Sequence, residues 1–161
     1  MNKFLKLIFI IIVFAIIGFS REFFFVQMNV ILYEKYYNSI NTEFPVAPIM
    51  KFFTKYSYSS LYYSKYIFTL LTVLVYYIVS FYSLKLLGYK NIIKYLSYCY
   101  LLLLTLAAIT MLYGYIVNNR LQDSEYTISR WLLGIAQSPI IFLILIASQK
   151  LNNTLTKNNA L

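Results

Sequence analysis

Long apolar runs separated by short polar stretches dominate the chain. Four of them approach the roughly 20 residues that a transmembrane helix needs, and they cover about residues 4–25, 66–87, 92–117 and 131–148. Lipid offers no hydrogen-bond partners to an open backbone, so each run is expected to be a helix rather than an isolated strand. The pattern predicts an all-α membrane protein with four transmembrane helices.

The connections between these runs differ in character. Residues 26–65 are rich in Tyr and Lys and contain Pro45 and Pro48, which is typical of a segment that lies at a membrane interface. We predict a partly helical, amphipathic outer segment there. A tight turn at residues 88–91 makes the second and third runs an antiparallel hairpin, and residues 117–129 are expected to be a polar loop. Residues 1–161 are expected to form a single integral membrane domain.

Composition leads to the same class of protein. Hydrophobic residues make up 61% of the 161 residues and charged residues 12%, whereas soluble domains average about 45–50% and about 25%. A water-soluble fold of this length cannot bury so much apolar surface, so the lipid bilayer is the first expected partner. The N-terminal run resembles a signal peptide but lacks a small-residue cleavage site, which favours a retained helix.

Charge predicts the orientation in the membrane. One set of helix flanks carries seven positive charges and no acid: Lys3, Lys6, Lys85, Lys90, Lys94, Lys150 and Lys157. The other side also carries seven positive charges, but with all five acids of the chain: Glu22, Glu34, Glu43, Asp123 and Glu125. Short basic flanks favour the cytoplasm, so both termini are expected there. The net charge of +9 is thus assigned to topology and anionic lipid, and no nucleic acid is expected as a partner.

Candidate catalytic chemistry is sparse. The chain has no His, a single cysteine, Cys99, within an apolar run, and a single Asp, Asp123, in the predicted loop. Haem and zinc sites normally use His or clustered Cys, and intramembrane proteases use a Ser–His pair or two carboxylates within the membrane. We therefore predict a protein that is not an enzyme, with no catalytic residue, no metal and no cofactor.

A charged pair, Arg21 and Glu22, interrupts the first run and is followed by Phe23–Phe25. If the helix starts near Phe4, Arg21 lies about 25 Å along it, close to the outer boundary of the bilayer. Arg130 begins the last run at the same level. The three charges are predicted to form a site that binds a partner or a polar head group. Arg beside aromatic residues is equally typical of an interfacial anchor, and that alternative stays open.

The last run adds Gln137 to this candidate site, because it places an amide inside the span. An amide there is also typical of packing between helices. Gly134 and Ser138 are four residues apart, the small-xxx-small spacing that allows a neighbouring helix to approach closely. Pro139 predicts a distortion of the helix.

The last run, RWLLGIAQSPIIFLILIASQK, resembles the final span of the exosortase F system-associated proteins, small membrane proteins encoded beside exosortases in flavobacteria. The matching positions are Arg130, Gln137, Pro139 and Gln149, and Arg21 with Phe23–Phe25 is similar to the family's early motif. The resemblance implies an accessory role in protein sorting or envelope export at the bacterial inner membrane, with no chemistry of its own.

Three functions follow in order of preference. The first is a non-enzymatic accessory subunit that docks to a larger membrane-protein complex. The second is a small oligomeric channel or transporter, which is disfavoured because the middle and last runs offer no ionisable group at mid-membrane beyond Tyr and Cys99. The third is a membrane enzyme that binds lipid head groups through Arg21, Glu22 and Arg130.

Overall fold

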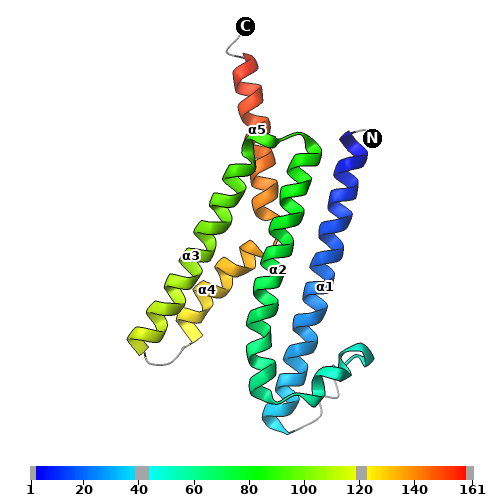
Figure 1. Cartoon of the computed structure of the whole chain (residues 1–161), viewed down its shortest axis with the longest axis vertical. Coiled ribbons are helices and arrows are strands. Elements are labelled where there is room, and N and C mark those ends of the chain that lie inside the picture. The colour runs from blue at the N-terminus through cyan, green and yellow to red at the C-terminus, as the bar shows by residue number, and fades with distance from the viewer. Residues whose placement is uncertain (1–2, 39–43, 119–122, 159–161) are drawn as a thin grey trace. The chain divides into compact units, whose positions relative to one another are not determined.

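A computed structural model describes residues 3–38, 44–118 and 123–158, and these residues form helices without any strand (Figure 1). Glu43 and Arg120 lie outside the described residues, as do the side chains of Lys3, Asp123, Glu125 and Lys157. The elements in chain order are α1 (Lys3–Tyr37), η1 (Pro48–Lys55), α2 (Tyr58–Leu87), η2 (Lys90–Ile92), α3 (Ile93–Asn118), α4 (Asp123–Ala136) and α5 (Ile140–Asn158). The all-α prediction is confirmed.

Three stretches of the described residues are helical, long and apolar enough to cross a membrane: Phe4–Tyr37, Tyr58–Leu87 and Lys90–Val117. A fourth crossing is present if α4 and α5 are counted together, because they are bent by 61° at a short break. These helices fit a multi-pass membrane protein. The predicted last span is therefore two helices rather than one.

The helix boundaries differ from the predicted ones at four places, one of which is the end of α5 at Asn158 rather than Ser148. α1 does not end near Phe25 but continues without interruption to Tyr37. α2 begins at Tyr58 rather than Tyr66, where the Oγ of Ser57 accepts a hydrogen bond from the N–H of Ser60 at 3.3 Å and so caps the helix. α4 begins at Asp123, so the end of the predicted loop 117–129 is helical.

The spacing of the backbone divides the chain into two compact units. Residues 1–14 and 73–161 form one, here called the bundle unit, and residues 15–72 form the other, here called the η1 unit. The sequence had predicted a single domain. Each unit is described by itself below.

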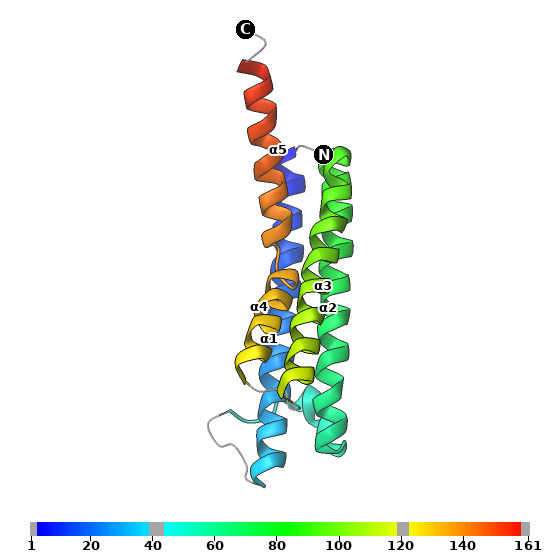
Figure 2. The same cartoon turned by 90° about the vertical axis from the view of Figure 1, so that its left-hand side faces the viewer.

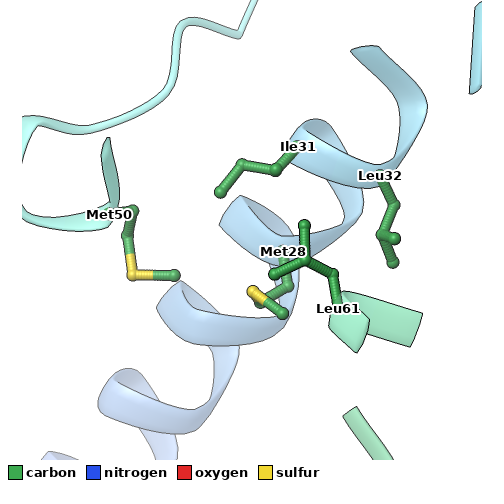
Figure 3. Close-up of a cluster of buried hydrophobic side chains, with 5 residues drawn as sticks. All are labelled: Met28, Ile31, Leu32, Met50 and Leu61. Atoms are coloured by element: carbon green, nitrogen blue, oxygen red, sulfur yellow. The ribbon is translucent and has the colours of Figure 1, made fainter. Parts of the chain in front are cut away.

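The η1 unit is built around a small apolar core. Its buried members are Met28, Ile31 and Leu32 of α1, Met50 of η1 and Leu61 of α2 (Figure 3). Phe24, Val46, Ala47 and Phe53 pack against this cluster. The segment that was predicted to be a partly helical, amphipathic outer segment therefore contributes to a folded core.

Two hydrogen bonds explain why α1 remains helical through polar residues. The N–H of Ala47 donates to Oε1 of Gln27 at 2.7 Å, and Nζ of Lys65 donates to Oδ1 of Asn29 at 2.7 Å. The side chains of Gln27 and Asn29 thus have partners from later segments of the same unit. Because those partners lie 20 and 36 residues away in sequence, local patterning gave no sign of them.

The bundle unit contains the α2–α3 hairpin, and α3 also packs against α4 and α5. Gly88 ends α2 in the left-handed region, with φ +87°, and the N–H of Tyr89 donates to the carbonyl of Leu84 at 2.9 Å. This is a Schellman arrangement, in which glycine is favoured because it has no Cβ. Tyr77 and Ser97 share a hydrogen bond of 2.9 Å between α2 and α3.

Aromatic packing joins the N-terminal helix to the rest of the bundle unit. The ring of Phe14 lies 5.9 Å from that of Tyr76 and 5.1 Å from that of Phe142, measured between centroids. In both views, the start of α1, the α2–α3 turn and the far end of α5 lie at the same end of this unit (Figures 1 and 2). The helix ends to which the predicted lysine-rich flanks belong therefore lie at the same end of the bundle unit.

Candidate partner-binding site

The break between α4 and α5 is the main irregularity of the last span (Figure 1). The N–H of Gln137 still donates to the carbonyl of Leu133 at 2.9 Å, but the N–H of Ser138 reaches Ile135 at 3.2 Å, one residue short of the α-helical partner. Pro139 has no N–H to offer. The helical pattern resumes when Leu143 donates to the carbonyl of Pro139 at 3.0 Å. The distortion predicted at Pro139 is present.

Ser138 satisfies the backbone that the break opens. Its Oγ donates to the carbonyl of Ile135 at 2.7 Å and accepts a longer hydrogen bond from the N–H of Ile140 at 3.4 Å. An unpaired backbone group in lipid costs several kcal/mol, so this local pairing lets the chain bend within an apolar segment. Ser138 therefore acts within its own helix pair.

Gln137 lies inside the bundle unit. Its side chain is only 4% exposed, and the neighbouring Ala136 is fully buried. This position favours the helix-packing alternative for Gln137 over direct contact with a partner.

Gly134 lies one turn before the break and faces open space. A Cβ built at Gly134 would meet no atom within 4 Å. The close helix approach predicted from Gly134 and Ser138 is therefore not made by any described residue of this chain. Such an approach stays a prediction for a second chain.

Arg130 and Trp131 lie beside Gly134 on the exposed side of α4. Both are exposed, with Trp131 at 74%, and residues three and four apart share a helix face. We call Arg130, Trp131 and Gly134 of α4, together with Ser138 in the break that follows, the α4 open face. It combines a guanidinium, a large aromatic ring and a small-residue gap.

Ser129 belongs to the opposite side of α4 and was not among the predicted site residues. It is 1% exposed, and its Oγ has no hydrogen-bond partner among the described residues. Its spacing of seven residues from Ala136 puts both on one helix face, and this spacing could have identified it as an inward position. Ser129 therefore lies on the buried side of α4, whereas the next residue, Arg130, is exposed.

Arg21 and Glu22 form an ion pair with each other on α1. Their side chains approach to 3.3 Å and are 30% and 66% exposed. The guanidinium of Arg21 also lies 5.3 Å from the ring centroid of Phe25. An exposed pair of this kind contributes about 0–1 kcal/mol, as expected of an anchor at an interface. Both residues belong to the η1 unit and Arg130 to the bundle unit, so a shared cluster of the three stays a prediction.

The described residues contain no group of three or more His, Cys, Asp or Glu side chains that could hold a metal ion. The fold fits a multi-pass helical membrane protein, and the site adds an open small-residue face on its bent α4–α5 pair. No protein-family model, curated protein or solved structure matches the chain.

Proposed function

We propose that the protein is a non-enzymatic accessory subunit of a larger membrane-protein complex, and that the α4 open face is its docking surface. The observation that carries this proposal is the open space at the position that a Cβ of Gly134 would occupy. Glycine within a helix costs up to about 1 kcal/mol relative to alanine. Among the described residues, no atom from another part of the chain lies within 4 Å of the position that a Cβ at Gly134 would take, so no close approach there offsets this cost, whereas a partner helix would supply one.

The chemistry of the α4 open face suits a partner within the membrane. Helices in lipid associate through small residues that allow backbones to approach closely. Arg and Trp are the side chains most enriched among residues that dominate binding energy at protein interfaces. Arg130 and Trp131 would thus flank the gap at Gly134 and provide specific contacts at its edge.

The exposed aromatic residues of the η1 unit support the same kind of role. Tyr36 and Tyr58 approach to 6.0 Å between ring centroids, and the hydroxyls of Tyr62 and Tyr66 are 3.1 Å apart. Tyr36 is 67% exposed and Tyr63 is also 67% exposed. Tyrosine supplies both apolar contact and a polar hydroxyl, which suits a surface that meets another protein near the lipid head groups.

The resemblance to the exosortase F system-associated proteins suggests which complex is involved. Arg130, Gln137, Pro139 and Gln149 all lie on the bent α4–α5 pair, the region that we propose for docking. We therefore propose a role in protein sorting or envelope export, in the inner membrane of a bacterium, with both chain termini in the cytoplasm.

Affinity purification from native membranes in a mild detergent tests the accessory role. The wild-type chain is expected to bring down one defined membrane protein, and Arg130→Ala is expected to reduce its yield. Lys94→Ala is the matched control, because Lys94 is an exposed cation at the other end of the bundle unit. Equal yields from all three chains would remove Arg130 from the docking surface, and the absence of any specific partner would refute the accessory role.

A small channel or transporter is the second candidate, because discontinuous helices often form the substrate or ion site of transporters. The break at Gln137–Pro139 is the observation in its favour. Conductance measured in liposomes that contain only the purified chain separates the two functions. The accessory role predicts no current above that of empty liposomes.

A further inference from the structure

An open groove of about 690 Å³ lies in the bundle unit, between the first turns of α1 and the last turns of α2. Its walls include Phe9 and Val13 of α1 and Val79 of α2. Nearer the ends of the two helices it is lined by Lys6, Tyr82 and Lys85. The groove is thus apolar along its length and cationic at one end, and its volume falls within the roughly 300–1,000 Å³ of typical ligand sites.

Lys6 is held at the cationic end by a specific contact. Its Nζ donates to the carbonyl of Leu86 at 3.1 Å, in the last turn of α2. A lysine ammonium has three donors, and this hydrogen bond uses one of them. The carbonyl positions the charge without neutralising it.

No acidic residue competes for these lysines nearby in sequence. Residues 3–14 and 73–118, which supply both walls of the groove and the following turn and helix, contain no Asp or Glu. Two of the lysines in these residues, Lys6 and Lys85, line the groove itself. The charge at this end therefore complements an anion.

We propose that this groove binds one anionic phospholipid. The head-group phosphate lies at Lys6 and Lys85, and an acyl chain follows Phe9, Val13 and Val79. A small soluble anion would leave the apolar walls unused, and an uncharged apolar molecule would leave the two ammonium groups unused. A phospholipid with a net negative head group fits both parts of the groove.

Native mass spectrometry of the full-length chain tests this site. The protein is purified in a neutral detergent and titrated with phosphatidylglycerol or phosphatidylcholine, and glycerol phosphate serves as the head group without acyl chains. The double variant Lys6→Gln/Lys85→Gln removes the charges, and Val13→Phe fills the groove with the charges intact. Lys94→Gln is the control, since it removes an exposed lysine that does not line the groove.

The proposal predicts one tightly bound phosphatidylglycerol and weaker binding of the other two probes. Each lysine is expected to contribute about fivefold to affinity, so the double variant loses roughly 25-fold. Val13→Phe is expected to abolish the tight site, and Lys94→Gln to keep it. Equal binding of the two lipids, equal loss in Lys94→Gln and the double variant, or unchanged binding by Val13→Phe would overturn the proposal. Circular dichroism of each variant verifies that the helices are intact, and a misfolded Val13→Phe is replaced by Val79→Phe.

Discussion

Replacing Gly134 with leucine separates an effect on a partner from an effect on the chain itself. The added Cβ meets no atom within 4 Å, so the larger side chain extends into open space. Leucine is a much better helix former than glycine, by close to 1 kcal/mol on aqueous scales. The isolated chain is therefore expected to be as stable as the wild type, or more stable by up to about 1 kcal/mol.

The same substitution is expected to weaken a complex that uses the α4 open face. Inserting extra carbon atoms into a well-packed contact typically costs about 1–3 kcal/mol. At about 1.4 kcal/mol for each factor of ten, the partner would bind about 5- to 150-fold more weakly. Gly134→Ala adds a single carbon and is expected to give an intermediate loss.

The assay compares the yield of copurified partner with the stability of the purified chain. Ala108→Leu is the control, because it creates the same side chain at an exposed position of α3. Unfolding is followed through Cys99, the single native cysteine, which is half-buried on α3. If Gly134→Leu retains its partner as well as Ala108→Leu does, at equal stability, then Gly134 does not lie at the interface.

Three further predictions concern the fold. Gly88→Ala is expected to lower the free energy of unfolding by about 1–2 kcal/mol, because φ at Gly88 is +87° and any side chain is strained there. The loss is measured as reaction of Cys99 at a lower temperature on heating, and unchanged heating curves would contradict the prediction. Leu61→Ala is expected to destabilise the η1 unit by about 2–5 kcal/mol. This would appear as faster proteolysis within residues 15–72, while Cys99 in the bundle unit reacts as before. Equal digestion of the variant and the wild type would rule out the proposed core. With Cys99 replaced by serine, Asn91→Cys is expected to react with an impermeant maleimide only from the cytoplasmic side and Asp123→Cys only from the outside, and the reverse result would invert the topology.

The hydrophobic pattern predicted which segments are helices better than it predicted where they end. The predicted end of the second run agrees with the end of α2, and the predicted start of the third run agrees with the start of α3 to within one residue. Glycine and lysine mark the turn between them. The first run was expected to stop near Phe25 and to be followed by a separate, partly helical outer segment. In α1 the helix instead continues through the polar residues Gln27 and Asn29. Their partners, Ala47 and Lys65, come from distant segments, and no local signal indicates such contacts.

The length of α1 shows whether Arg21 and Glu22 mark the end of the helix. A helix of 35 residues is about 52 Å long, compared with about 30 Å for the hydrocarbon core. If the helix enters at Lys3, Arg21 and Glu22 lie about 27 Å further on, where it leaves the hydrocarbon. The pair therefore does not terminate the helix, and its position suits an interfacial anchor.

The candidate site was only partly visible in the sequence. Gly134, Ser138 and Pro139 could be selected from spacing and residue type, because small residues and proline have known effects in membrane helices. The burial of Gln137 depends on tertiary packing, and this required the fold. The groove at Lys6 and Lys85 also escaped notice, since the two lysines are 79 positions apart and each alone resembles an ordinary topological signal.

The short turn at Gly88 also constrains how the protein is made. Only five residues separate the end of α2 at Leu87 from the start of α3 at Ile93. This connection is too short for the two helices to enter the bilayer one after the other. During synthesis they would have to partition into lipid together as a hairpin, and in the topology that we propose the lysine-bearing turn stays on the side of the ribosome. A longer connection would permit stepwise insertion and would remove this coupling between translation and membrane entry.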